Sequence, residues 1–411
     1  MRSPTLHVLA DDLSGAAECA AAVARAARQP TALVLKGALP AHGSWSVDTD
    51  SRALPPDTAA IVATSALREA AAGDTAVLFK KIDSTLRGNV APELRAVLAV
   101  RNLIDAAVVC PTLPSQGRTL LGGVLHIHGR PQVDRDFRSL DLLRLLHAAG
   151  AEPVRLRLAH GATAGELASE LIGCVRWGAR ILVVDAAGDD DLRRLAQALL
   201  AARDGARLLS VGSAGLASAL ADELLVASET DTPALHVPRE GSLVAVVGSF
   251  NPVTTMQLDE LANEADVHHV RLDASCWLNR ADAVASELTK AAEQADRGKS
   301  IVITATGAVS GKSTRELVQR IAVAAEPMIR RAGILVLTGG DTARTVLDRL
   351  GVERLQVLGE LEPGICLSGG GVDSPAIVTK AGGFGDRHSL VRVLRHFRPT
   401  ASTNTSPESK A

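Results

Sequence analysis

The sequence predicts an α/β protein with two doubly wound domains, each with a mainly parallel sheet, and an interdomain cleft. At 411 residues the chain is too long for one ordinary hydrophobic core. Short apolar runs alternate with Ala-rich stretches of helical spacing, a pattern typical of strands buried on both faces of a parallel sheet. The alternation breaks once and then restarts, which indicates a second domain.

Five apolar runs predict the strands of the N-terminal domain. They are "TLHVLA" (5–10), "TAVLFK" (75–80), "AAVVC" (106–110), "RILVVD" (180–185) and "ARLLSV" (206–211). Helical spacing of the apolar residues predicts helices over residues 15–27, 92–100 and 191–203.

The break falls at residues 227–243, where Pro, Gly, Thr and charged residues replace the alternation. Four further strands are expected at 243–247, 300–306, 333–338 and 376–380. We therefore expect one domain over 1–228, a linker over 229–242, a second domain over 243–398 and a disordered tail over 399–411.

The composition excludes several classes of partner. Lys and Arg total 44 against 46 Asp and Glu, and this balance argues against a nucleic-acid or membrane-surface binder. The five cysteines are scattered and form no CxxC pair, which favours a reducing compartment. The N-terminus makes a poor signal peptide, so a soluble cytoplasmic protein is expected.

In open α/β sheets ligands bind beyond the carboxyl ends of the strands, so the turns there are the places to search. Asp11 and Asp12 follow the first expected strand in "ADDLSGA". Such paired carboxylates can orient a hydroxyl, act as a general base or bind a metal. The alternative is that Asp12 merely caps the following helix, and the residues favour neither reading.

The turn "KKIDSTLRGN" (80–89) combines Lys81, Asp83, Ser84 and Arg87. Cations together with hydroxyls suit a small anion such as a sugar acid. Arg52 and Arg118 lie in loop-like segments that can face the same cleft, although each segment alone is weak evidence.

Three turns of the C-terminal domain are rich in glycine: "VVGSFNPVT" (246–254), "TGGDTARTVL" (338–347) and "KAGGFGDRHSL" (380–390). Exposed backbone amides at a helix N-terminus form a phosphate site. Any one such turn could serve only for chain reversal, but three in one sheet favour a nucleotide or a phosphorylated ligand.

The stretch "GAVSGKST" (307–314) looks like a Walker A loop but has the wrong spacing. Such a loop needs Gly five positions before the Gly-Lys pair, and Thr306 stands there. Gly307 leaves a spacer of only three residues, which changes the path of the amides around a β-phosphate. The sequence therefore predicts no P-loop.

Taken together, the motifs resemble those of the four-carbon acid sugar kinase family. They are, in order, "ADDLSGA", "DSR" (50–52), "KKIDSTLRGN", "PSQGRT" (114–119), "GSAGLA" (212–217), "GSFNPVTTMQ" (248–257), "GGDTA" (339–343) and "KAGGFGD" (380–386). The resemblance implies phosphorylation of the terminal hydroxyl of threonate, erythronate or 3-oxo-tetronate. The N-terminal domain would bind the acid sugar and the C-terminal domain ATP, with Mg²⁺ bridging the phosphates as ATP chemistry normally requires.

The resemblance also implies roles for particular residues. Its substrate side comprises Asp11, Arg52, Lys81, Ile82, Asp83, Ser84, Arg87 and Arg118. The general base would be Asp11 or Asp12, with Asp83 as the second choice. Its nucleotide side comprises Ser249, Gly339, Gly340, Asp341, Thr342, Gly382 and Gly383.

The stretch 126–141 departs from the family pattern, and the substrate half contains it, so the particular acid sugar and its stereoisomer stay open. The magnesium ligands, the pathway and the oligomeric state, for which a homodimer is one option, are also undetermined. Two other functions remain: an NAD-dependent dehydrogenase, which lacks support because no GxGxxG follows the first strand of either domain, and a non-catalytic acid-sugar-binding protein. Consumption of ATP on addition of a four-carbon acid would distinguish a kinase from these two alternatives.

Overall fold

The computed structural model describes residues 4–71, 76–100, 102–133, 140–158, 161–225, 242–307, 312–369 and 375–397. All of the expected linker except Ser242, and all of the expected tail, lie outside these residues. Among the described residues, no helix combines the length and the apolar character needed to cross a membrane.

The N-terminal half alternates strands and helices as the sequence predicts. Its strands are β1 (Thr5–Ala10), β2 (Thr31–Val34), β3 (Trp45–Asp48), β4 (Ala76–Lys81), β5 (Ala106–Cys110), β6 (Arg118–Leu121), β7 (Val124–Ile127), β8 (Arg130–Pro131), β9 (Pro153–Arg157), β10 (Ile181–Asp185) and β11 (Leu208–Gly212). Its helices are α1 (Leu13–Ala27), α2 (Pro56–Ala70), α3 (Val90–Leu98), α4 (Leu142–Ala148), α5 (Ala164–Arg176), α6 (Asp189–Ala201) and α7 (Ala214–Leu224).

The C-terminal half repeats this alternation. Its strands are β12 (Leu243–Val247), β13 (Val267–Asp273), β14 (Ser300–Thr306), β15 (Ile334–Thr338), β16 (Arg354–Glu362), β17 (Ile365–Gly369) and β18 (Ala376–Lys380). Its helices are α8 (Pro252–Leu261), α9 (Ala274–Asn279), α10 (Ala281–Asp296), α11 (Lys312–Ile329), α12 (Gly340–Leu350) and α13 (Ser389–His396). The predicted α/β class is confirmed, and each of the nine predicted strands overlaps an observed one.

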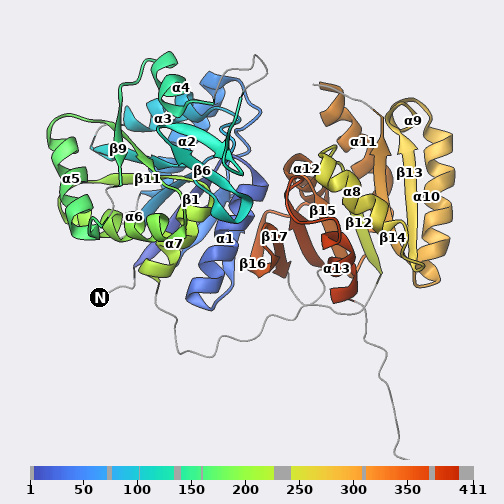
Figure 1. Ribbon diagram of the computed structural model, residues 1–411. Coiled ribbons are helices and arrows are strands. Elements are labelled where there is room, and N and C mark those ends of the chain that lie inside the picture. Colours follow the sequence, from blue (N-terminus) through green and yellow to red (C-terminus); the bar gives the residue numbers. More distant parts are fainter. Residues whose placement is uncertain are drawn as a thin grey trace, which may run out of the picture.

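The sheets of the two halves join into one sheet of 15 described strands, in the order β13-β14-β12-β15-β18-β17-β16-β2-β3-β1-β4-β11-β5-β10-β9. Most pairing within each half is parallel, but β16 pairs antiparallel with both β2 and β17, and β17 pairs antiparallel with β18. The described chain also contains a small antiparallel sheet, β6-β7-β8, in the N-terminal half. Figure 1 shows β16 and β17 between the two halves. The sequence did not predict this junction, which covers the short apolar strand β2 at what would otherwise be an exposed sheet edge.

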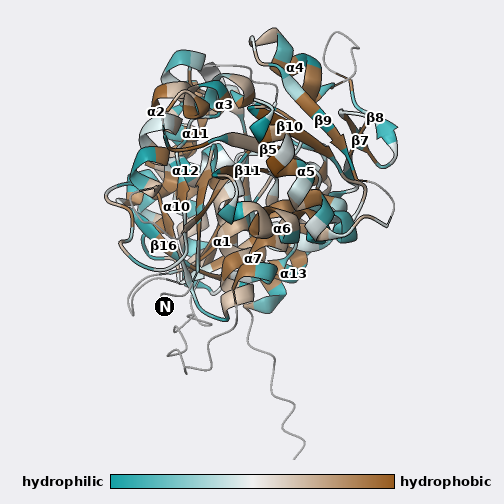
Figure 2. Ribbon diagram, turned by 90° about the vertical axis from the view of Figure 1, so that its left-hand side faces the viewer, coloured by the Kyte–Doolittle hydropathy of each residue, from teal (hydrophilic) through white to brown (hydrophobic). Residues whose placement is uncertain are grey.

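Helix α1 lies where the two halves meet. It packs against β1, β2 and β3 of its own half and against β16 and β17 of the other. Ala16, Ala17, Ala20 and Ala21 are all buried, and such small side chains allow the helix to approach both sheets closely. The strands behind it are strongly hydrophobic, whereas the outer helix faces carry polar residues (Figure 2). The start of α1, at residues 11–15, is thereby fixed between the two halves.

Candidate active site

A cavity of about 550 Å³, the cleft, is lined by residues from both halves. Of the predicted residues, its lining includes Asp12, Arg52, Lys81, Asp83, Ser84, Arg87 and Arg118 from the N-terminal half. From the C-terminal half it includes Ser249, Gly339, Gly340, Asp341, Thr342, Gly382 and Gly383. Asp11 and Ile82 are the two predicted residues that do not line the cleft. Both are almost fully buried, at 3% and 1% exposure.

Arg52 is bound by two adjacent aspartates. Its Nε donates to Asp11 Oδ2 and its Nη2 to Asp11 Oδ1, both at 2.8 Å. The same Nη2 donates to Asp12 Oδ1 at 2.8 Å, and Nη1 lies 2.7 Å from Asp12 Oδ2. Arg52 was expected on the substrate side of the site, but in the structure its guanidinium is already engaged by these two side chains.

The two aspartates differ in their environment. Burial raises the pKa of Asp11, but the Arg52 guanidinium more than offsets this, so that its pKa lies below the usual value. Burial raises the pKa of Asp12, and the neighbouring Asp11 adds to the effect, so that its pKa stays above the usual value despite Arg52. Asp12 also caps α1 by accepting from the Gly15 amide at 3.0 Å. The Asp12 side chain therefore both caps α1 and lines the cleft.

Asp83 is held as an anion by its neighbours. It accepts from the Thr85 amide at 2.7 Å and from the Thr85 hydroxyl at 2.8 Å, and it pairs with Arg87. Burial raises the pKa of Asp83, but Arg52 and Arg87 outweigh burial and lower it to about 2. A carboxylate so strongly stabilised in its charged form is a poor proton acceptor.

Two cations of the cleft have no carboxylate within ion-pair distance in the described chain: Lys81 and Arg118. A Cβ on Gly15 would overlap the Lys81 ammonium, which places that ammonium over the first turn of α1. Arg118 bonds to the Ser84 hydroxyl and lies over the Phe384 ring, 5.4 Å from its centroid. The Arg118 Nε is buried without a hydrogen-bond partner. Such cations without a direct ion pair suit an anionic ligand.

The wall from the C-terminal half consists of glycine turns at the ends of three strands. Gly339, with φ of 99°, adopts a conformation that favours glycine and precedes the first turn of α12. A Cβ on Gly382 would overlap the Ser249 hydroxyl, so the turn lies directly against that side chain. Helix N-terminal amides beside glycine turns make a cradle that fits a phosphate group.

Lys380, the last residue of β18, stabilises the turn that contains Gly382 and Gly383 by hydrogen bonds. Its ammonium donates to the Ala381 carbonyl at 3.0 Å and to the Gly382 carbonyl at 3.4 Å. The side chain is 1% exposed, and burial lowers its pKa to about 8.

Several other residues that line the cleft belong to turns singled out in the sequence but were given no role of their own: Ser14, Gly15, Thr85, Gly248, Phe250, Asn251, Ala381 and Phe384. Sequence reasoning missed Glu18 and Val318, and it excluded the stretch that contains Thr314 as a P-loop. Glu18 gave one signal, because it is the single acidic residue of the Ala-rich helix predicted over 15–27. Thr314 belongs to "GAVSGKST", whose residues 308–311 lie outside the described chain.

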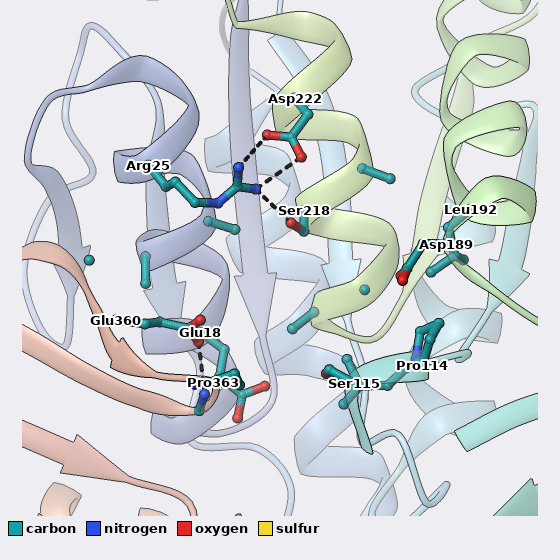
Figure 3. Close-up of a pocket in the computed structure, with 18 of the residues that line it drawn as sticks. Glu18, Arg25, Pro114, Ser115, Asp189, Leu192, Ser218, Asp222, Glu360 and Pro363 are labelled. Atoms are coloured by element: carbon teal, nitrogen blue, oxygen red, sulfur yellow. Dashed lines mark hydrogen bonds and ion pairs between the residues drawn. The ribbon is translucent and has the colours of Figure 1, made fainter. Parts of the chain in front are cut away.

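A second cavity of about 800 Å³, the rear cavity, adjoins the cleft and shares Glu18 and Phe384 with it. Figure 3 shows its walls, which come from α1, α7 and the turn between β16 and β17. Arg25 crosses between the helices to Asp222 at 2.9 Å and to the Ser218 hydroxyl at 2.8 Å. The rear cavity is the larger of the two, but none of the predicted site residues lines it.

The described residues contain no cluster of three or more His, Cys, Asp or Glu side chains suited to hold a metal ion. Magnesium bound with a nucleotide needs only one or two carboxylates, because phosphates and water supply the other ligands. Asp341, exposed in the first turn of α12, is a carboxylate of the glycine-rich wall that fits this requirement.

Two family models match the chain. One, a sugar-binding N-terminal domain, matches residues 6–220, and the other, a nucleotide-binding C-terminal domain, matches residues 244–390. The chain is 33% identical to a D-threonate kinase of Cupriavidus necator, covering 93% of this chain and 95% of that protein. It is 28% identical to a D-erythronate kinase of Heliobacterium modesticaldum, covering 97% of this chain and 98% of that protein. It is also 28% identical to a 3-oxo-tetronate kinase of Methylobacterium radiotolerans, covering 95% of this chain and 99% of that protein.

Two solved structures share the fold. A Salmonella typhimurium protein superposes with a TM-score of 0.76 at 20% identity, covering 96% of this chain and all of that one. A Haemophilus influenzae protein superposes with a TM-score of 0.67 at 21% identity, covering 95% of this chain and all of that one.

Proposed function

The chain belongs to the four-carbon acid sugar kinase family, and on that premise we propose that it transfers a phosphoryl group from ATP to the terminal hydroxyl of a four-carbon acid sugar. The observation that carries this is the asymmetry of the cleft. One wall presents an aspartate and two cations without a direct ion pair, and the other presents glycine turns at helix N-termini. An anionic acceptor and a phosphate donor fit these walls respectively.

On the acceptor wall, Lys81 and Arg118 would bind the carboxylate of the acid sugar. Asp12 would take the proton of the terminal hydroxyl while the oxygen of that hydroxyl bonds to the γ-phosphorus of ATP and ADP leaves. Asp12 is preferred over the other two candidates because its carboxylate lines the cleft and its pKa is raised by burial. Asp11 is instead engaged by Arg52 beneath the cleft wall, and Asp83 is held as an anion. Arg52 would orient Asp12 rather than contact substrate.

On the donor wall, amides of the Gly339–Thr342 turn and of Gly382 and Gly383 would bind the phosphates of ATP. ATP supplies the transferable phosphoryl group, and Mg²⁺ neutralises its charge, with Asp341 as a carboxylate available on this wall. Phe384, which lies against Arg118 from the opposite half, would cover the bound acid sugar and exclude water.

An ADP-release assay over a panel of acids tests this function. We propose D-threonate as the first acid, because the relative that is 33% identical bears that name. D-Erythronate, L-threonate and 3-oxo-tetronate complete the panel, and 2,3-dihydroxybutanoate, which lacks the terminal hydroxyl, is the control. We expect acid-dependent ADP release and a 4-phosphate product by ³¹P NMR. Acid binding measured by calorimetry without any ADP release would favour a non-catalytic acid-sugar-binding protein.

A further inference from the structure

Glu18 is a buried carboxylate that the mechanism above does not use. It lies in the second turn of α1 and is 7% exposed, yet it makes no hydrogen bond or ion pair with any described residue. Its side chain lines both the cleft and the rear cavity. Because the carboxylate faces these cavities and no described residue donates to it, a ligand in the cleft can supply its donor.

The charged groups around Glu18 place it on the acceptor side of the cleft. Burial raises the pKa of Glu18 to about 7. The positive charge of Lys81 lowers this pKa, whereas the negative charges of Asp12 and Glu360 raise it further. Arg118 is a further, weaker attraction. Lys81 and Arg118 are the two cations assigned above to the carboxylate of the acid sugar. A substrate with its carboxylate at these two cations would bring its inner hydroxyl groups close to Glu18.

We propose that Glu18 is a specificity-determining residue that accepts a hydrogen bond from the C2 or C3 hydroxyl of the acid sugar. This inference rests on the proposed function. The acid sugar enters with its carboxylate at Lys81 and Arg118 and its terminal hydroxyl at Asp12, and the hydroxyls between these ends supply the donor that Glu18 lacks. A site with a buried group that needs a hydroxyl discriminates strongly against analogues without one.

Glu360 provides a matched control for Glu18. The two carboxylates lie close together at the rear cavity (Figure 3). Glu360 does not line the cleft, and it already accepts a hydrogen bond from the Gly364 amide at 2.9 Å. Exchanging Glu360 for Gln therefore alters the charge next to Glu18 and in the rear cavity without removing an acceptor from the substrate site.

The test compares kcat/KM for the best acid of the panel with that for its 2-deoxy and 3-deoxy analogues, 3,4- and 2,4-dihydroxybutanoate. In the wild type, loss of the hydroxyl that Glu18 binds is expected to lower kcat/KM about 10- to 100-fold, as for a hydrogen bond to a charged group. In Glu18→Ala this penalty is expected to shrink to about threefold or less, because the acceptor is gone. Glu360→Gln should keep the wild-type penalty.

A penalty that stays unchanged in Glu18→Ala would overturn the proposal, because a merely structural role lowers activity on all the acids alike. Glu18→Leu, which has no hydrogen-bonding group and leaves less empty space than alanine, serves the same comparison if the alanine variant does not fold. Absence of acid-dependent ADP release by the wild type would instead refute the proposed kinase function. In that case the dissociation constants of the acid and its deoxy analogues are measured by calorimetry for the wild type and for Glu18→Ala. If loss of the hydroxyl weakens binding equally in both proteins, the role of Glu18 is overturned.

Discussion

Asp12 and Gly340 face each other across the cleft from opposite halves of the chain. A Cβ on Gly340 would lie 3.1 Å from the Asp12 Oδ2 and 3.2 Å from the Ser14 hydroxyl. Because these distances are tighter than ordinary van der Waals contacts, only a residue without a side chain leaves the carboxylate undisturbed. The proposed base and the proposed phosphate turn are thus in direct apposition, as transfer between their ligands requires.

Replacing Gly340 by Ala is expected to lower kcat/KM for ATP about tenfold or more, because small misplacements of reacting groups are costly. The melting temperature should change little, since alanine favours the helix that begins there. Steady-state kinetics with ATP varied, together with thermal unfolding, check both parts. Gly173→Ala is the control, since a Cβ on Gly173 in α5 meets no atom within 4 Å. Equal activity of the two variants would contradict the apposition.

Asp12→Asn is expected to lower kcat about 10²- to 10⁴-fold while the dissociation constant for ATP stays within a few-fold of wild type. The asparagine still caps α1, so the fold should be retained. Single-turnover kinetics and nucleotide binding by calorimetry measure the two quantities. Turnover close to wild type would exclude Asp12 as the proton acceptor.

Asp11→Asn should have a different signature, because Asp11 is buried beneath Arg52 and does not line the cleft. Removing one charge of this buried pair is expected to destabilise the fold by about 3 kcal/mol. Urea unfolding measures this loss. If Asp11→Asn has wild-type stability but lacks activity, then the roles of the two aspartates have been assigned the wrong way round.

Because of the buried Lys380, the folded protein is expected to become more stable at alkaline pH. Its pKa is lowered by burial to about 8, below its value of about 10.4 in an unfolded chain. Between these pH values the unfolded chain binds more protons, so this residue's contribution to stability rises with pH, by about 3 kcal/mol in total. The measurement is the difference in unfolding free energy between wild type and Lys380→Met from pH 7 to 10.5. A difference that does not vary with pH would contradict the lowered pKa.

Arg344 and Asp48 form an ion pair between the halves, with Nη1 and Oδ2 2.8 Å apart and the Asp48 side chain fully buried. Arg344→Met should cost about 3–5 kcal/mol at pH 8, because it leaves a buried carboxylate unpaired. Burial raises the pKa of Asp48 to about 7 even beside Arg344, so the loss should be smaller at pH 5, where that carboxyl is protonated. Urea unfolding at both pH values tests this, and additive losses in Arg344→Met with Asp48→Asn would argue against the pair.

Much of the fold could be predicted from sequence because buried parallel strands are continuous apolar runs. The runs at 106–110 and 243–247 are buried at every position in the structure. Strands β16 and β17 were not predicted, because only Leu355 and Val357 of the nine residues of β16 are buried, so that it forms no continuous apolar run, and its partner β2 is only four residues long. Pairing between segments so distant in the chain has no local signal in the sequence.

The candidate site could be predicted in outline because its turns follow the strands directly. The sequence did not show which of its charged groups are already paired. Arg52 and Arg118 look alike as sequence, yet three aspartates pair with the first and no carboxylate of the described chain pairs with the second. Glu18 was missed because an isolated acidic residue in an Ala-rich helix is usually on a solvated face.

The antiparallel pairing of β2 with β16 also bears on how the chain is made. Val34 pairs with Arg354, so a ribosome must synthesise nearly the whole chain before β2 acquires this neighbour. Until then, the nascent N-terminal half has an open strand edge of the kind that recruits other chains. Translation that stalls before β16 emerges should therefore yield fragments that depend on chaperones or aggregate.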